Sequence, residues 1–345
     1  VEVTEISLKI LDILNEKNNL HFETEKALFG GCSIDKHGVP VTKEIIQKAK
    51  NADAVLLGAV GGAKWENLKH EIKPESGLLE LRKELDTFAN LRPAVVYPAL
   101  ADASTLKKEI VENVDIMVVR ELTGGIYFGK PRGIKQIGNN EQKGVNTLHY
   151  TTSEIERVAK MAFEIARKRR KKVTSIDKSN VLESMVLWRN TVTKVWERDY
   201  QDIELEHLYV DNAAMQLIRR PKTFDVMLAG NMFGDIISDE AAQLTGSLGM
   251  LPSASIGYKG GIYEPVHGSA PDIAGKDIAN PIASILSMGM MLKYSFNLDN
   301  ISTGIEEAVK AVLSRGFRTA DIFEEGKTKV GCEEMGNLIL EELKN

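Results

Sequence analysis

The sequence predicts a mixed α/β fold, and three observations support this class. The chain has 345 residues, long enough for two domains or for one large α/β domain. Short apolar segments of strand length alternate along it with longer segments of helical periodicity, as βα units require. The glycine fingerprint GxGxxG is absent, so a Rossmann dinucleotide-binding fold is not expected.

The composition is that of an ordinary globular protein. Hydrophobic residues make up 43%, charged residues 27%, and the formal net charge is −5. Without a basic field, nucleic acid and anionic membranes are not expected partners. No apolar run approaches the roughly 20 residues of a membrane span, and no signal-peptide pattern opens the chain. Cys32 and Cys332 lack CxxC spacing, which favours free thiols in the cytoplasm over a disulfide.

The chain starts directly with an amphipathic helix. Its apolar stripe consists of Val3, Ile6, Ile10, Ile13 and Leu14. An α/β chain normally has a strand and a turn before such a helix. We therefore expect a strand and a turn to precede residue 1 in the natural protein.

Strands and helices follow in alternation. Apolar segments bounded by turn residues predict strands at 54–58, 94–97, 115–120, 173–176, 205–209 and 224–229. Helical patterns predict helices at 74–86 and from residues 153, 182 and 211. The last third of the chain is glycine-rich up to Gly275 and helical beyond it.

Local signals refine this outline. The continuous apolar run within 115–120 is typical of a strand buried on both faces. Ser153 and Glu156 predict a capping box at a helix start. Residues 133–150 are polar and weakly patterned, which fits either a flexible loop or a protruding hairpin. The basic run 167–172 is expected to complement the dipole of a solvated helix end rather than to bind phosphate.

Asp235 and Asp239 are the most informative pair of side chains. Their spacing places both carboxylates on one face of a helix, one turn apart. Such carboxylates repel unless a proton or cation lies between them, and open oxygen ligand sets suit Mg²⁺ or Mn²⁺. A solvated acidic face is the commoner explanation for a lone pair. However, Gly230, Gly234 and the preceding strand 224–229 place the pair past a strand's carboxyl end, where open α/β sheets bind ligands.

Arg82, Arg92 and Arg120 are candidates for a carboxylate clamp. A guanidinium fork binds a carboxylate through two parallel hydrogen bonds, so converging arginines suit a di- or tricarboxylate. Arg92 lies at a predicted turn, residues 90–93, and Arg120 ends a buried strand. Each arginine alone is more often a surface ion-pair partner, but a charge at the end of a buried strand makes Arg120 the strongest candidate.

Tyr127 and Lys178 are candidates for proton transfer. Tyr127 lies in a glycine-flanked loop that permits close approach of a substrate. Lys178 follows a predicted buried strand, and a desolvated lysine near a metal loses its proton readily. A hydrogen-bonded structural role is the simpler explanation for either residue alone.

Residues 264–276 form a long loop rich in small residues. Small side chains let backbone N–H groups approach an adenine or a pyrophosphate. The loop contains His267 and Asp272 and runs on to Asn280, and an aspartate accepts hydrogen bonds from ribose hydroxyls. We therefore expect this loop to bind a nucleotide.

Together, these motifs resemble those of the β-decarboxylating 2-hydroxyacid dehydrogenases of the isocitrate/isopropylmalate dehydrogenase type. The resemblance covers essentially the whole chain, and family members open with a strand and a GDGIG-type turn just before the point where this chain begins. The matching motifs are ESGLLELR (75–82), NLRP (90–93), VRELTGGIYFG (119–129), DK (177–178), YVDN (209–212), the pair Asp235 and Asp239, and HGSAPD (267–272).

The resemblance implies oxidation of (2R,3S)-3-isopropylmalate by NAD⁺ in leucine biosynthesis, with loss of CO₂ to give 4-methyl-2-oxopentanoate. It also implies a mixed sheet divided between two domains, one of residues 1–87 plus 246–345 and one of residues 88–245. The first domain would contain both termini and the cofactor loop. The second would contain the substrate, metal and dimer-forming regions, with residues 133–150 as a protruding arm.

The resemblance also assigns residue roles. Substrate contacts are expected from Glu75, Leu78, Leu79, Arg82, Arg92, Arg120, Val181 and Asp211. Cofactor contacts are expected from Gly62, Glu75, Asn180, Glu264, His267, Gly268, Ser269, Ala270, Pro271, Asp272, Ile273 and Asn280. Mg²⁺ or Mn²⁺ would be bound by Asp211, Asp235 and Asp239.

The catalytic residues implied by the resemblance are Tyr127, Lys178 and Asp211. Lys178 would help to remove the hydroxyl proton, and Tyr127 would protonate the enolate after decarboxylation. Lys178 and Asp211 would reach each site from the partner subunit, which implies a homodimer with shared sites.

Two alternatives stay open. The chain could act on another 2-hydroxy acid, such as isocitrate, homoisocitrate, tartrate or D-malate, or it could be an inactive metal-binding homologue. Leu78 and Leu79 favour an isopropyl group over a third carboxylate, and none of the proposed catalytic positions is substituted. A metal-dependent phosphatase built on the aspartate pair would lack a nucleophile and a phosphate loop.

Overall fold

A computed structural model describes residues 2–344 of the chain, which divide into two compact units. The first unit comprises the residues up to Thr87, residues Val96–Lys108 and the residues from Thr245 onward. The second unit comprises Phe88–Val95 and Glu109–Leu244. Residues 1 and 345 of the predicted domain bounds lie outside the described residues.

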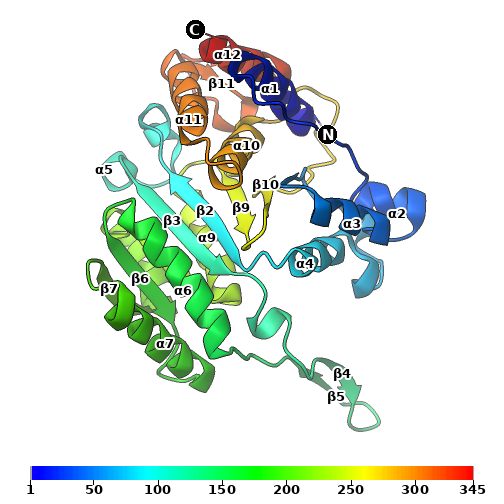
Figure 1. Cartoon of the computed structure of the whole chain (residues 1–345), viewed down its shortest axis with the longest axis vertical. Helices are drawn as coiled ribbons and strands as arrows, with labels where there is room; N and C mark the ends of the chain where they lie inside the picture. The colour runs from blue at the N-terminus through cyan, green and yellow to red at the C-terminus, as the bar shows by residue number, and fades with distance from the viewer. Residues whose placement is uncertain (1, 345) are drawn as a thin grey trace. The chain divides into compact units, whose positions relative to one another are not determined.

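The first unit combines a small mixed sheet with a helical layer (Figure 1). Its helices are α1 (Glu2–Asn18), α2 (Gly31–His37), α3 (Lys43–Asn51), α4 (Pro74–Glu84), α10 (Ile282–Tyr294), α11 (Asp299–Ser314) and α12 (Cys332–Lys344). Its strands are β1 (Val55–Leu56), β9 (Pro252–Ile256), β10 (Gly261–Pro265), β11 (Phe317–Arg318) and β12 (Thr328–Lys329). Within this unit β10 pairs parallel with β1 and antiparallel with β9, and β11 pairs parallel with β12.

Helix α10 is the centre of the first unit. Every residue from Ile282 to Leu292 is buried, as expected for a helix that is apolar or small on all sides. Helices α1 and α11 and strands β9 and β10 pack around it, and α12 packs on α1 and α11. Because α10 is buried on all sides, its small polar side chains need hydrogen-bond partners within the protein. Ser287 donates to the Ala283 carbonyl at 2.7 Å.

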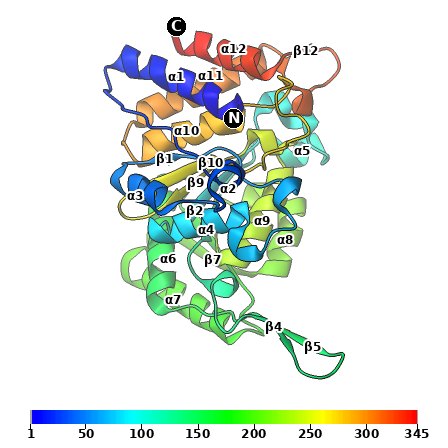
Figure 2. The same cartoon turned by 90° about the vertical axis from the view of Figure 1, so that its right-hand side faces the viewer.

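The second unit has a sheet in the order β2-β3-β8-β6-β7. Its strands are β2 (Ala89–Val95), β3 (Asp115–Glu121), β6 (Lys172–Asp177), β7 (Glu204–Tyr209) and β8 (Val226–Ala229). Its helices are α6 (Thr152–Arg167), α7 (Glu183–Asp199), α8 (Val210–Arg219) and α9 (Asn231–Gln243), with α5 (Lys108–Val111) at the start of its second segment. Helices α6 and α7 cover one face of this sheet, and α8 and α9 cover the other (Figure 2).

Four strands of the second unit run parallel, which determines where its functional side chains lie. β3 pairs parallel with β8, β8 with β6, and β6 with β7, whereas β2 is antiparallel to β3. The carboxyl ends of the parallel strands therefore share one edge with the amino end of β2. Ligands of α/β sheets bind at such an edge.

Two local predictions were wrong. Residues 90–93 form part of β2 rather than a turn, because antiparallel pairing with β3 from Ala89 to Val95 overrides the turn preference of Asn90 and Pro93. The capping box uses Thr151 and Glu154 instead of Ser153 and Glu156, and it begins α6 two residues earlier than predicted. Both sequences satisfy the capping pattern, so the pattern alone does not determine which one is used.

Residues 133–150 contain the hairpin β4 (Gly133–Gln136) and β5 (Gln142–Val145), which resolves the alternatives of loop and hairpin. Both strands are almost entirely exposed. The hairpin extends away from the sheet and helices of its own unit (Figures 1 and 2). Neither strand has an apolar face buried within that unit.

The basic run at the end of α6 is held by carboxylates. Arg167 pairs with Asp202, Arg169 with Asp115 and Asp225, and Lys172 with Glu204 and Glu206. Ion pairs to neighbouring elements therefore stabilise this run alongside the helix dipole.

Residues 96–108, which the predicted bounds place in the second domain, group with the first unit. The 3₁₀ helix at Pro98–Ala103 packs against α11, and Arg318 donates to the Ala99 carbonyl at 2.6 Å. Across residues 2–344, no helix combines the length and apolar character needed to cross a membrane.

Candidate active-site residues

Arg120 and Asp235 form the central ion pair of the second unit. Arg120 lies near the end of β3, and its side chain is only 5% exposed. Its Nη1 contacts the Asp235 carboxylate, and its Nε and Nη2 donate to the Asn231 side-chain oxygen at 3.1 and 2.9 Å. Helix α9 begins directly after β8, the neighbour of β3, and this order brings Asn231 and Asp235 to the guanidinium.

Gly234 makes this close approach possible. A Cβ atom at this position would lie 2.8 Å from the Cβ and the Cγ of Arg120. Real Cβ contacts are essentially never this short, so any larger residue would push α9 away from β3. Packing on Arg120 therefore explains this glycine, which the sequence showed only as a small residue at the helix entry.

Arg92 binds the second aspartate. Its Nη1 donates to Asp239 at 2.9 Å and to the Ser238 hydroxyl at 2.8 Å, and its Nε donates to the Asn90 side chain at 2.9 Å. Its Nη2 lies 3.6 Å from Asp235. Arg92, Arg120, Asp235 and Asp239 thus converge, with each carboxylate neutralised by a guanidinium. Arg82, the third arginine of the predicted clamp, does not pair with either aspartate.

Tyr127 joins the same cluster. Its hydroxyl donates to the other Asp235 oxygen at 3.0 Å, and the Arg120 guanidinium lies 5.8 Å from its ring centre. Burial and the negative charge of Asp235 raise the pKa of Tyr127 above its ordinary value. A phenol held in its protonated form is a suitable proton donor.

Lys178 and Asp211 form a separate pair at the ends of β6 and β7. Lys178 Nζ donates to Asp211 at 2.5 Å, and this bond lowers the pKa of the Asp211 carboxyl. The lysine follows Asp177, which is fully buried and accepts hydrogen bonds from Arg189 at 2.8 and 3.1 Å. In this state Lys178 is an ion-pair donor rather than a free base.

The predicted metal ligands are not assembled within one chain. Among residues 2–344, no group of three or more histidine, cysteine or acidic side chains is close enough to hold a metal ion. Asp235 and Asp239 supply hard oxygen ligands one helical turn apart, a donor set that fits Mg²⁺ or Mn²⁺. The expectation that Asp211 completes this ligand set from a partner subunit stays a prediction.

Predicted cofactor residues meet within the first unit. The Ser269 hydroxyl donates to the Gly61 carbonyl at 2.6 Å, which ties the HGSAPD loop to the glycine turn that follows β1. Gly61 has a φ of +101°, and a Cβ there would lie 2.8 Å from a Glu75 oxygen. Gly62, Glu75 and Ser269 therefore lie around one turn, although they are far apart in the sequence.

The same loop offers groups that fit a nucleotide. His267 Nδ1 donates to the Gly268 carbonyl at 3.0 Å, while its buried Nε2 has no hydrogen-bond partner among the described residues. An orphaned buried nitrogen of this kind suits a ligand atom. Asp272 is exposed, as a residue that binds ribose hydroxyls would be before its ligand arrives.

Other predicted residues already have structural partners. Arg82 pairs with Glu264 at 2.8 Å, and both side chains are 9% exposed, so in this state a predicted substrate ligand and a predicted cofactor ligand neutralise each other. The Asn280 side chain donates to Asp321 and accepts from the Ile282 N–H. Leu78 packs against the core cluster of Leu57, Leu81 and Ile262.

The remaining predicted residues have no specific partner that supports a role. Leu79 and Ile273 are half-buried. Asn180, Val181, Gly268, Ala270 and Pro271 are exposed. Their roles stay predictions.

Sequence analysis missed the polar residues that hold the arginines. Asn90, Asn231 and Ser238 each accept a hydrogen bond from Arg92 or Arg120. Asn231 is fully buried. The signal for it in the sequence was its position, two residues after the end of the predicted strand 224–229. Arg189, which binds Asp177 beside Lys178, carried no such signal.

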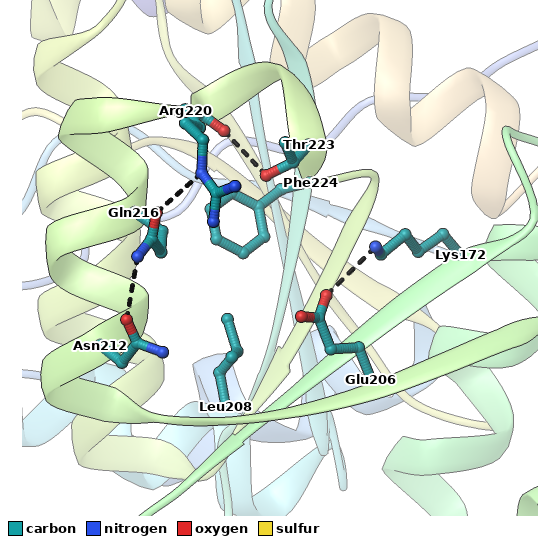
Figure 3. Close-up of a pocket in the computed structure, with 8 residues that line it drawn as sticks. All are labelled: Lys172, Glu206, Leu208, Asn212, Gln216, Arg220, Thr223 and Phe224. Carbon is teal, nitrogen blue, oxygen red and sulfur yellow. Dashed lines mark hydrogen bonds and ion pairs between the residues drawn. The ribbon is translucent and has the colours of Figure 1, made fainter.

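A cavity of about 260 Å³ lies elsewhere in the second unit (Figure 3). Its lining comes from β6, β7, α8 and the segment before β8: Lys172, Glu206, Leu208, Asn212, Gln216, Arg220, Thr223 and Phe224. No predicted site residue lines it, and Figure 3 shows its polar side chains bonded to one another. We assign the chemistry to the arginine–aspartate cluster instead, because charged groups converge there.

The chain is similar to known proteins over essentially its whole length. The sequence profile described as isocitrate/isopropylmalate dehydrogenase matches residues 1–339. A protein of Pseudomonas fluorescens (strain Pf0-1) named 3-isopropylmalate dehydrogenase is 57% identical over 345 residues, covering 100% of this chain and 96% of its own length. A protein of Pelagibacter ubique with the same name is 56% identical, covering 99% of this chain and 95% of its own.

Solved structures share the fold. Isocitrate dehydrogenase from Methylococcus capsulatus superposes with a TM-score of 0.87 at 29% identity and covers 100% of this chain and 96% of its own. A beta-decarboxylating dehydrogenase from Thermococcus kodakarensis gives a TM-score of 0.78 at 32% identity. This match covers 99% of this chain and 92% of the Thermococcus chain. The predicted fold class is confirmed by these likenesses.

The buried pair of Arg82 and Glu264 generates a stability prediction. Glu264→Gln leaves a buried guanidinium without a counter-charge, so the free energy of unfolding should fall by about 3 kcal/mol. Urea denaturation measures this loss. The control is Glu333→Gln, which breaks a pair with Lys9 whose side chains are 66% and 55% exposed and should cost less than about 1 kcal/mol. Equal losses in both variants would contradict the importance assigned to the buried pair.

Proposed function

The chain belongs to the isocitrate/isopropylmalate dehydrogenase family, and we propose that it catalyses NAD-dependent oxidative decarboxylation of (2R,3S)-3-isopropylmalate in leucine biosynthesis. The products are 4-methyl-2-oxopentanoate and CO₂. Relatives with this activity in their names support the substrate. The observation that carries the chemistry is the convergence of Arg92, Arg120, Tyr127, Asp235 and Asp239 at one sheet edge.

The arginines bind the substrate carboxylates. Arg92 and Arg120 present guanidinium forks, the geometry that matches a carboxylate. Without substrate, Asp235 and Asp239 occupy these forks. Arg82 adds a further contact, and Leu78 and Leu79 of α4 meet the isopropyl group.

Asp235 and Asp239, with Asp211 of a second copy, hold Mg²⁺ or Mn²⁺. When bound, the metal supplies positive charge that stabilises the developing alkoxide and enolate. NAD⁺ supplies the hydride acceptor and is held by the glycine turn, Glu75 and the HGSAPD loop. The orphaned His267 Nε2 and the exposed Asp272 carboxylate support this nucleotide site.

Proton transfers fall to Lys178 and Tyr127. The ion pair between Lys178 and Asp211 first has to open. Lys178 then removes the proton of the substrate hydroxyl as hydride leaves C2 of the substrate. Tyr127 then donates its hydroxyl proton to the substrate enolate once CO₂ has left. The Tyr127 hydroxyl and Arg120 both bind the Asp235 carboxylate. The proton of Tyr127 therefore lies next to the arginine that is proposed to bind substrate.

A second copy of the chain completes the site. Met215 and Ile218 of α8 are 61% and 43% exposed, and Ile236 of α9 is 58% exposed. Asp211 shares the exposed face of α8 with Met215 and Ile218, because the spacings of four and seven residues return to one side of a helix. Burial of this face against α9 of the partner would bring Asp211 and Lys178 towards the partner's aspartate pair.

The reaction is tested by one assay of NADH production. The substrates are 3-isopropylmalate, isocitrate, D-malate and tartrate, each at several concentrations with NAD⁺ and Mg²⁺. We expect the highest kcat/KM for 3-isopropylmalate, because the leucine pair of α4 suits an alkyl group. A higher kcat/KM for another acid would replace the proposed substrate, and no turnover of any acid would indicate an inactive homologue.

Shared sites predict complementation between two inactive variants. Asp235→Asn removes a metal ligand, and Lys178→Met removes the base, so each homodimer should lose most activity. If both residues act across the interface, a heterodimer has one site with both defects and one intact site. Mixed subunits should then regain about a quarter of wild-type activity at random assortment.

Unmixed variants carried through the same exchange procedure are the controls for complementation. A chelator should abolish the regained activity, since the intact site still requires metal. No recovery from confirmed heterodimers would mean that Lys178 and Asp235 serve the same site within one chain.

Cofactor choice depends on Asp272. A carboxylate accepts hydrogen bonds from both ribose hydroxyls of NAD⁺ but repels the 2′-phosphate of NADP⁺. We expect kcat/KM to favour NAD⁺ by a factor on the order of 10². Asp272→Lys combined with Ile273→Tyr should shift the preference towards NADP⁺. Asp12→Lys, at an exposed position of α1, makes the same charge change elsewhere and should leave the ratio unchanged.

A further inference from the structure

Tyr150 is a buried tyrosine that no step of the proposed reaction uses. It is 7% exposed and directly precedes Thr151, the N-cap of α6. Its ring meets the edge of Trp188, with ring centres 5.3 Å apart and planes at 62°. It therefore has a fixed position within the second unit.

The ring of Tyr150 contacts the backbone of two functional segments. Gly124 and Gly125 lie in the loop that leads to Tyr127. A Cβ atom at Gly124 would lie 2.9 Å from the Tyr150 ring, and one at Gly125 would lie 2.4 Å from the Tyr150 hydroxyl. A Cβ at Gly230, at the start of α9, would lie 3.0 Å from its hydroxyl. Only glycines leave room for it, so one side chain holds the Tyr127 loop against the helix that carries Asp235.

The hydroxyl of Tyr150 binds the start of α9, where it accepts the Asn231 backbone N–H at 2.7 Å. Glu121 is fully buried and accepts the backbone N–H groups of Thr123 and Gly124 at 2.8 and 2.9 Å. The loop that Glu121 holds therefore includes Gly124, on which the Tyr150 ring packs.

Asn231 reinforces this link from the other side. Its side-chain amide donates to the carbonyls of Leu122 and Gly124 at 3.0 and 3.1 Å, while its oxygen accepts from Arg120. The loop before Tyr127 is thus fixed through its carbonyls by Asn231 and through its N–H groups by Glu121. Tyr150 adds a third contact, because its hydroxyl binds the Asn231 backbone and its ring packs on Gly124.

We propose that Tyr150 is a positioning residue, whose hydroxyl bond to the Asn231 backbone and ring contact with Gly124 and Gly125 place the Tyr127 hydroxyl at Asp235 for proton donation. This inference rests on the proposed function, in which Tyr127 protonates the enolate. Loss of the link would let the loop at 123–127 shift without removing any group that binds substrate. A misplacement of about 1 Å is enough to slow a positioned reaction by up to about a hundredfold.

The test is a double-mutant cycle on the wild-type reaction. Tyr150→Phe keeps the ring against its glycines and removes only the hydroxyl. We expect its kcat to fall by about tenfold or more, with the KM for 3-isopropylmalate within about twofold and a rapid first turnover of NADH retained. In the Tyr127→Phe background the same change should have no further effect on kcat, because the residue that Tyr150 positions is already inactive.

Two further variants separate positioning from stability. Glu121→Gln weakens the bonds that hold the N–H groups of the same loop and should reproduce the specific loss in kcat. Tyr200→Phe removes the hydroxyl of another buried tyrosine of the second unit and should leave kcat unchanged. Both measurements are made with the full chain, NAD⁺ and Mg²⁺.

The outcomes distinguish this inference from the proposed function. No oxidation of 3-isopropylmalate by the wild type would refute the proposed function and with it the role of Tyr150. Turnover by the wild type with an unchanged kcat in Tyr150→Phe would refute the positioning role alone. Losses that multiply in the double variant would also refute it, since they would show that Tyr150 acts independently of Tyr127.

Discussion

Charge neutralisation between Arg120 and Asp235 is the interaction on which the rest of this site depends. Arg120 is almost fully buried at the end of a strand, where an unpaired charge would cost several kcal/mol. Its partners Asp235 and Asn231 both come from α9, so β8 has to lie parallel beside β3 for the pair to form. Gly234 then has to lack a side chain because Arg120 fills that space.

The same interaction explains how two carboxylates coexist on one turn of α9. Asp235 and Asp239 would repel each other, but Arg120 and Arg92 provide the positive charge between and around them. In the proposed reaction the aspartates would hold a divalent cation and the arginines would bind the substrate carboxylates. The ion pairs between arginines and aspartates would then be exchanged for these contacts.

A single chain divides the chemistry between two places on the sheet edge. Arg120, Tyr127 and Asp235 lie where β3 and β8 end, whereas Lys178 and Asp211 pair where β6 and β7 end. This separation and the exposed apolar face of α8 support the proposal that a second copy supplies the missing groups. Assembly would then be part of catalysis, because each site would draw on both chains.

The sequence by itself determined the local features of this protein. Strand β3 followed from its continuous apolar run, and the shared face of Asp235 and Asp239 followed from helical periodicity. Residue spacing within one element is enough for such inferences, because helix and strand geometry are fixed by the backbone. The fold class followed from the order of these elements and from the motifs that resemble a known family.

The tertiary structure decided which partners each side chain has. Arg82 and Glu264 are far apart in the sequence, and only the packing of the first unit makes them a buried ion pair. Residues 90–93 form part of β2 because antiparallel pairing with β3 stabilises a strand there more than the local sequence favours a turn. Tyr150 was silent in the sequence because its role depends on glycines from two distant segments meeting at its ring. Long-range contacts of this kind leave no periodic signal, since each residue alone is compatible with many neighbours.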